Sequence, residues 1–300
     1  MKLKNLRIAR GKLIVAMAIW GTISLFVKQI SMPSAEIALF RAVIAIAILL
    51  VFKRVTDGRF SIPNLRSEWI PLLLSGAAMG ANWVLLFEAY RYTTVSVATL
   101  SYYFAPVLVM VLSPVLFHEH SSWKQRLCFL FSTIGLVLVV NVGQISLGDR
   151  NLTGILLGLG AAGCYAGVML LNKFCKRVGG IDRTIIQFVS AGTVLLVYIL
   201  FTSGITISSL DHTGLLNLLI LGTIHTGFSY CLFFTAVKEL PGQESAILSY
   251  IDPFVSILVS VFLLHEKMTG LQCIGGALIL GFTLLNELDV ELSKKSTIKE

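Results

Sequence analysis

Asp252 and His225 are two ionisable side chains within long apolar stretches of this 300-residue sequence. The two stretches meet at Pro241, and counting the helical rise from that turn places both side chains within about one turn of the same depth. At the centre of a membrane-spanning helix a charged side chain costs ~2.5–3.5 kcal/mol or more. We hypothesise that Asp252 and His225 line a cavity, where they bind a substrate, carry a coupling proton, or do both. A hydrogen bond between packed helices is the alternative.

Arg41 and Glu88 form a second candidate pair, in two other apolar stretches. Arg41 lies about six residues from the end of its stretch, or ~9 Å deep, and Glu88 lies near the corresponding end of the next. Opposite charges at similar depth predict an ion pair. Such a pair would gate the outer mouth of a cavity, read the charged ends of a substrate, or hold two helices together.

Aromatic and amide side chains also occur deep within the apolar stretches, although Tyr and Trp prefer membrane interfaces. At depth their polar atoms need partners or a wet cavity. As a set they predict a pocket for an amphipathic or aromatic-containing solute, although each one alone is also compatible with simple packing. The set comprises Trp20, Asn82, Trp83, Tyr102, Tyr103, Tyr165, Tyr230 and Tyr250.

Motifs for catalysis, metal binding or nucleotide binding do not emerge. The pairs His118-Glu119 and His265-Glu266 lack the second histidine of HExxH, and we interpret them as helix-end anchors or gating contacts. The five cysteines show no metal or disulfide spacing. GLGAAG at 158–163 lies inside an apolar stretch, where no nucleotide site can form. The sequence therefore predicts no cofactor, no metal and no enzyme.

The composition indicates which elements hold these residues. Hydrophobic residues make up 56% of the chain and charged residues 13%, against about 45–50% and about 25% in soluble domains. The mean hydropathy is +0.84. Because no soluble fold buries so much apolar surface, the sequence predicts an integral membrane protein in contact with lipid. The net charge of +8 comes from Lys and Arg between apolar runs, which is a topology signal and not a nucleic-acid surface.

Ten segments are long and apolar enough, or nearly so, to cross a bilayer as helices. Helices are favoured over a barrel because barrel strands are shorter and alternate polar with apolar residues. The predicted spans are Gly11–Gln29, Ala35–Phe52, Trp69–Tyr90, Ser96–Phe117, Trp123–Asn141, Thr153–Leu171, Thr184–Phe201, Gly214–Ala236, Gln243–Leu264 and Thr269–Asn286.

The basic residues predict the orientation. With a cytoplasmic N-terminus, 19 of the 24 Lys and Arg residues fall in cytoplasmic segments, 4 fall outside, and Arg41 lies within a span. This asymmetry is typical of multi-pass proteins. It predicts a protein of the cytoplasmic membrane with both termini in the cytoplasm.

The two halves of the chain resemble each other. Residues 87–119 and 234–266 align with one offset of 147 residues, which pairs Tyr103 with Tyr250 and Pro106 with Pro253. We expect repeats over 1–143 and 144–300. Five spans in each half make the second repeat inverted relative to the first, as in many secondary transporters. Pro106 and Pro253 are predicted to kink their helices.

The duplicated pattern resembles the EamA-type carriers of the drug/metabolite transporter superfamily. The resemblance rests on Trp20 and Lys28, on Arg41, on Phe87 with Ala89, and on the run from Pro106 to Glu119. Its second copy matches through Ala236, Tyr250, Pro253 and Glu266. It implies ten helices in two repeats and movement of a small metabolite, often export of an amino acid or related compound. It assigns no role to Glu88 or Asp252.

These observations predict a secondary transporter that exports a small amphipathic solute by alternating access. Spans 1, 3 and 4, with their repeat mates 6, 8 and 9, are the expected cavity walls. Two alternatives remain open: a channel-like or lipid-scrambling protein, and an intramembrane enzyme using Asp252 with His225 or Glu88. The sequence does not identify the substrate or the coupling ion, and it leaves open whether the chain forms a homodimer.

Overall fold

The protein is built from helices throughout the part of the chain that the computed structural model describes, residues 2–56, 66–117, 122–140, 149–202, 204–207, 210–240 and 242–297. The first half holds α1 (Lys2–Gly21), α2 (Ile23–Val27), α3 (Ser34–Thr56), α5 (Trp69–Tyr92), α6 (Val95–Tyr102), α7 (Ala105–Phe117) and α8 (Trp123–Val140). The second half holds α9 (Arg150–Asn172), α10 (Gly180–Phe201), α11 (His212–Gly222), the π-helix η3 (Thr223–Phe228), α12 (Ser229–Val237), α13 (Gly242–Ser249), α14 (Ile251–Leu258), the π-helix η4 (Val259–Leu263) and α15 (Gly270–Thr297).

These helices make an all-α integral membrane protein. Among the described residues, eight helical stretches are long and apolar enough to cross a bilayer, and the shorter apolar helices Ile247–Leu263 and Gly270–Asn286 follow them. Together they correspond to the ten spans expected from the sequence, which confirms that prediction. Apolar side chains such as Val51, Phe201 and Phe262 remain exposed on the outside, where lipid replaces the water that a soluble protein would meet.

The helix contacts follow an exchange pattern between the halves. α5 packs on α9, and its counterpart α12 packs on α1; α6 and α7 pack on α9 as α13 and α14 pack on α1. Two contacts are unchanged when the halves are exchanged, because α3 packs on its own counterpart α10 and α8 packs on its own counterpart α15. This is the pattern of two similar five-helix units related by a two-fold axis.

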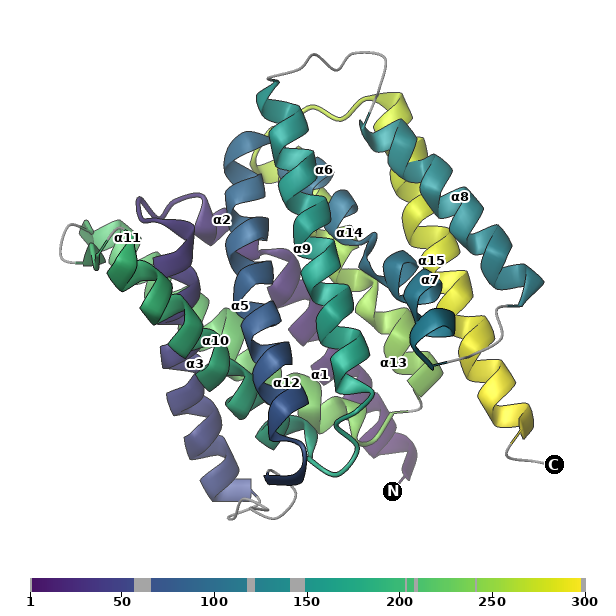
Figure 1. Ribbon diagram of the computed structural model, residues 1–300, viewed down its shortest axis with the longest axis horizontal. Helices are drawn as coiled ribbons and strands as arrows, with labels where there is room; N and C mark the ends of the chain where they lie inside the picture. Colours follow the sequence, from purple (N-terminus) through teal and green to yellow (C-terminus); the bar gives the residue numbers. More distant parts are fainter. Residues whose placement is uncertain are drawn as a thin grey trace.

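Both termini lie at the same edge of the bundle (Figure 1), as an even number of spans requires. We call this edge the N-terminal face and the other the opposite face. Near the N-terminal face Lys53 of α3 pairs with Asp182 of α10, with Nζ and Oδ1 2.5 Å apart. At the opposite face the Glu36 carboxylate accepts hydrogen bonds from the backbone N–H and hydroxyl of Thr206, both 2.8 Å. Asp182, near the start of α10, therefore binds the end of α3, and Glu36, near the start of α3, binds the segment that follows α10.

α8 and α15 lie side by side at one edge of the bundle (Figure 1). Their backbones approach closely at two glycines. A Cβ added to Gly275 would stand 2.5 Å from the carbonyl oxygen of Gly135, and one added to Gly135 would stand 2.7 Å from that of Gly275. Small residues allow this approach where no hydrophobic effect drives helices together within lipid.

The two repeat-matched prolines stand beside breaks in their helices. α6 ends at Tyr102 and α7 begins at Ala105, while α13 ends at Ser249 and α14 begins at Ile251. Pro106 and Pro253 thus lie in the first turns of new helices, where a missing N–H is tolerated. The predicted mid-helix kinks are therefore complete breaks, located at the repeat-equivalent Tyr103 and Tyr250.

Candidate functional site: a central cavity

A cavity of about 430 Å³ lies at the centre of the bundle and is lined from both halves. Four spans of each half contribute to it, whereas the described residues of α8 and α15 do not. The wall therefore includes spans 2 and 7, through Arg41 and through Arg183, Thr184 and Gln187, in addition to the six spans that the sequence predicted. A volume of this size suits a small solute.

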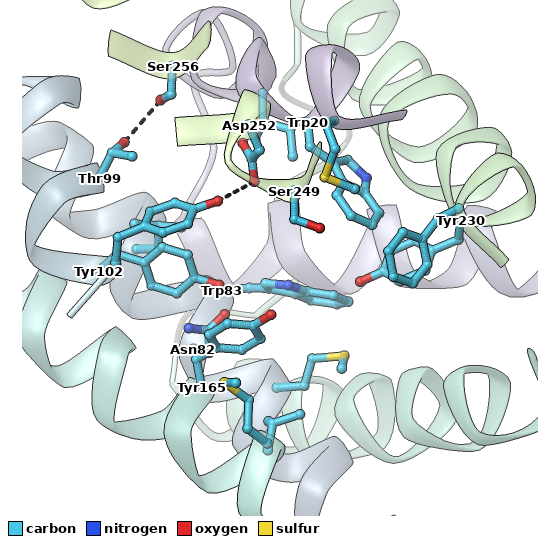
Figure 2. Close-up of a pocket in the computed structure, with 18 of the residues that line it drawn as sticks. Trp20, Asn82, Trp83, Thr99, Tyr102, Tyr165, Tyr230, Ser249, Asp252 and Ser256 are labelled. Carbon is cyan, nitrogen blue, oxygen red and sulfur yellow. Dashed lines mark hydrogen bonds between the residues drawn. The ribbon is translucent and has the colours of Figure 1, made fainter. Parts of the chain in front are cut away.

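Asp252 lies on this wall, near the start of α14. Its Oδ2 accepts a hydrogen bond of 2.6 Å from the Tyr103 hydroxyl, at the break between α6 and α7. Beside it the hydroxyls of Thr99 and Ser256 are 3.0 Å apart. Figure 2 shows both interactions as dashed lines, one ending at Asp252 and the other joining Thr99 of α6 to Ser256 of α14. The helix breaks of the two repeats thus meet at the acid.

Aromatic rings form a continuous row along the wall. Trp20 packs on Tyr230 with ring centroids 4.9 Å apart, and both line the cavity. Phe188, which is fully buried behind the wall, connects Tyr230 to Trp83 with centroids at 5.2 and 5.1 Å. In Figure 2 the Trp83 indole lies between Asp252 on one side and Tyr165 on the other. The cavity therefore combines broad aromatic surface with polar side chains, which suits an amphipathic solute.

Arg41 brings a cation to the same wall, and its residue is only 3% exposed. Its guanidinium carbon lies 4.5 Å from the ring centroid of Trp83 and 5.3 Å from that of Phe87. Its Nε donates to the Thr226 hydroxyl at 3.1 Å. Thr226 belongs to η3, where Gly227 lets α3 approach: a Cβ there would stand 2.6 Å from Ile48.

The predicted ion pair between Arg41 and Glu88 is not formed. Glu88 pairs instead with Arg91, one turn further along α5, with Nη1 and Oε1 3.5 Å apart. Among the described residues the carboxylates in ion pairs are bound to other cations, and none of them pairs with Arg41. Cation–π contacts supply roughly 0.5–2 kcal/mol, less than the cost of holding an uncompensated guanidinium away from water.

His225 does not lie on the cavity wall, contrary to expectation. Its residue is 3% exposed and packs behind the wall, with its ring 4.5 Å from that of Phe26. Its Nε2 lies 3.0 Å from the Thr22 hydroxyl, and its carbonyl accepts a 2.9 Å hydrogen bond from the Trp20 indole N–H. Depth counting from a turn gives the level of a residue but not the direction of its side chain, and of the two candidates the cavity wall includes Asp252 but not His225.

The other candidate residues divide in the same way. Asn82, Tyr165, Tyr250 and Pro106 lie on the wall, and the Asn82 amide donates to the carbonyl of Ala161 at 2.7 Å. Pro253 is buried but is not a wall residue.

A polar network towards the N-terminal face was missed in the sequence. The Gln187 amide nitrogen donates to Asn172 and to Ser75, both at 2.7 Å, and Gln187 and Asn172 line the cavity. An amide within the apolar span 7 was the available signal, the same signal that singled out Asn82 in span 3. Among the described residues no cluster of His, Cys, Asp and Glu could hold a metal ion.

Glu266 joins three segments at the opposite face. Its carboxylate pairs with Lys28 after α2, accepts from the Val95 N–H at the start of α6 at 2.7 Å, and accepts from the Ser260 hydroxyl of η4 at 2.6 Å. His265 takes a left-handed φ of 54°, which turns the chain sharply before Glu266. At the N-terminal face the equivalents of Lys28 and Ser260 also meet, since Lys173 donates to Ser113. His118 and Glu119, the matching pair of the first half, lie outside the described residues.

Comparisons with known proteins agree with this architecture. The profile of the EamA-like transporter family matches the chain twice, over residues 11–141 and 152–287. An uncharacterized transporter of Bacillus subtilis, YxxF, is 26% identical over 270 residues, covering 89% of this chain and 86% of the relative. The threonine/homoserine exporter RhtA of Escherichia coli K12 is 24% identical over 294 residues, covering 96% and 93%. One crystal structure shares the fold, with a TM-score of 0.63, 18% identity, and 93% of this chain and 96% of that one covered.

Proposed function

Because the chain belongs to the EamA-like transporter family, we propose that it is a secondary transporter that exports a small amphipathic metabolite across the cytoplasmic membrane by alternating access. The observation that carries the proposal is the central cavity, to which both halves contribute four spans. A site between two inverted repeats becomes accessible from either side when the repeats rock against each other.

An amino acid or a related compound is the proposed substrate. The wall combines aromatic surface with one carboxylate, Asp252, and with the guanidinium of Arg41. A relative that covers almost the whole chain is named a threonine/homoserine exporter, which supports both the solute class and the direction. Asp252, bound to Tyr103, is the proposed site of the coupling proton.

Reconstitution into proteoliposomes tests this function. Uptake of labelled amino acids and related metabolites is measured with and without an imposed pH gradient, beside empty liposomes. We expect saturable flux of one solute class, accelerated by the gradient. Flux that rises linearly with concentration would contradict the proposal and favour a channel-like or lipid-scrambling protein. Turnover of a lipid or peptide would favour an enzyme.

A further inference from the structure

We infer that Arg41 is the subsite for a carboxylate group of the transported solute, an inference that rests on the proposed function and deepens it. The first observation is the burial of the cation. Arg41 lies within α3 with its residue 3% exposed, yet it belongs to the cavity wall. A guanidinium stays charged in proteins, so this position holds a permanent positive charge beside the cavity.

The second observation is the absence of a counter-ion. Asp252 is the one acid among the described wall residues, and its contact is with Tyr103, not with Arg41. The described ion pairs join other residues. Within the described chain Nε has an acceptor, Thr226, and neither terminal Nη group donates to a side chain or a carbonyl. Buried charges in proteins are normally paired, so this site lacks an anion.

The third observation is how the guanidinium is held. Trp83 and Phe87 lie within cation–π distance of it, and Thr226 fixes Nε from η3. With Nε occupied, the two terminal nitrogens are the donors left for a ligand. They match the two oxygens of a carboxylate in a bidentate arrangement. The other wall cation, Arg183, lies in the first turn of α10, towards the N-terminal face, and donates to the Cys175 carbonyl at 3.4 Å. The subsite at Arg41 itself therefore offers a single guanidinium, which favours a monoanionic carboxylate over a phosphate.

Pairs of solutes that differ only in this group test the inference. Flux of phenylalanine and of threonine into proteoliposomes is compared with flux of phenylalanine amide and of threonine amide, which keep the ammonium group and the side chain. For the wild-type protein we expect kcat/KM to be at least about 100-fold lower for each amide, because buried donors built for an anion are then left unpaired.

Variants of Arg41 separate recognition from architecture. In Arg41→Gln the preference for acid over amide should fall to within about threefold, mainly by loss of flux of the acid. Arg41→Lys keeps the charge but loses the bidentate geometry and should give an intermediate preference. Arg126→Gln is the matched control, since this exposed guanidinium also lies over a tryptophan, 5.6 Å from the Trp123 ring, but on α8 away from the cavity. It should keep the wild-type preference.

The outcomes distinguish the inference from the function on which it rests. Equal transport of acid and amide by the wild-type protein, or an equal loss of both in Arg41→Gln and Arg41→Lys, would overturn the carboxylate subsite while leaving a transporter. Thermal unfolding of each variant in detergent, with and without phenylalanine, shows whether the fold is intact. Stabilisation by the acid in the wild type, its reduction in Arg41→Lys and its loss in Arg41→Gln support the subsite. Absence of flux and of stabilisation for every solute would overturn the proposed function as well.

Discussion

The chemistry of the cavity depends on side chains that the repeat does not duplicate. Asp252 aligns with Ala105, so only one half supplies an acid at this level. Its repeat-matched neighbours Tyr103 and Tyr250 both lie on the wall. The duplicated tyrosines therefore contribute to the shape of the site, and the unmatched Asp252 supplies its carboxylate.

Asp252→Asn should abolish the response to a proton gradient. The amide oxygen can still accept from Tyr103, so we expect a stability loss of about 1 kcal/mol or less, but the side chain no longer binds a proton at ordinary pH. Gradient-driven flux in proteoliposomes should fall to the level of empty liposomes.

Asp211→Asn is the control for this variant. Asp211 caps α11 through the Gly214 N–H at 2.9 Å, outside the cavity, and Asn caps helices about as well as Asp. Its flux should equal that of the wild type. If Asp252→Asn retained the gradient response, the coupling proton would have to bind elsewhere.

At the scale of helices, α8 and α15 form a unit that supports the cavity without lining it. Gly275→Val should separate them, because the added atoms would meet the Gly135 carbonyl. Overpacking of this kind costs about 1–3 kcal/mol, which lowers the midpoint of thermal unfolding in detergent.

The same helix provides a matched control for that change. A Cβ at Gly281 meets nothing within 4 Å, so Gly281→Val should leave the unfolding midpoint within about a degree of wild type. Equal effects of the two substitutions would show that valine within α15, and not the contact with α8, causes the loss.

Glu266 is the contact that we expect to close the opposite face, since it binds the ends of α2, α6 and η4 together. In Glu266→Gln the ion pair with Lys28 is lost. A shift of ~1 kcal/mol between closed and open forms changes the open population about fivefold. A cysteine introduced by Ser24→Cys, on the wall near this face, should then react about fivefold faster with an impermeant maleimide added from that side.

Glu88→Gln should leave this labelling rate unchanged. Glu88 pairs with Arg91 of its own helix. Glu88→Gln therefore removes the same charge as Glu266→Gln without breaking an ion pair between segments. The background for both variants replaces the five native cysteines. A rate that stays at the wild-type value in Glu266→Gln would count against closure by this residue.

At the scale of the whole molecule, the basic residues predict that the N-terminal face is cytoplasmic. Lys176 lies in the loop after α9 at that face, and His212 begins α11 at the other; both are exposed. In whole cells lacking the native cysteines, His212→Cys should react with an impermeant maleimide and Lys176→Cys should react only after permeabilisation. The reverse pattern would invert the topology.

The span count and the repeat could be predicted from the sequence because they depend on long apolar runs and on an offset that covers many residues. Asp252, Tyr103 and Asn82 could be placed on the cavity wall because polar groups at depth have few other destinations. The pairing of side chains was harder to predict from the sequence. Glu88 pairs with Arg91 and not with Arg41 because of the way α3 and α5 face each other. The direction of the His225 side chain depends on the rotation of the helix at η3.

The exchange of contacts between halves has a historical consequence. An ancestral chain with a single repeat would build the same shell by pairing two identical copies in opposite orientations. Every side chain in such a pair occurs twice, so a lone acid could not stand opposite a lone alanine. Fusion of the copies removes that restriction, because each half can then change by itself, and the difference between Asp252 and its repeat equivalent Ala105 is one that two identical copies could not carry.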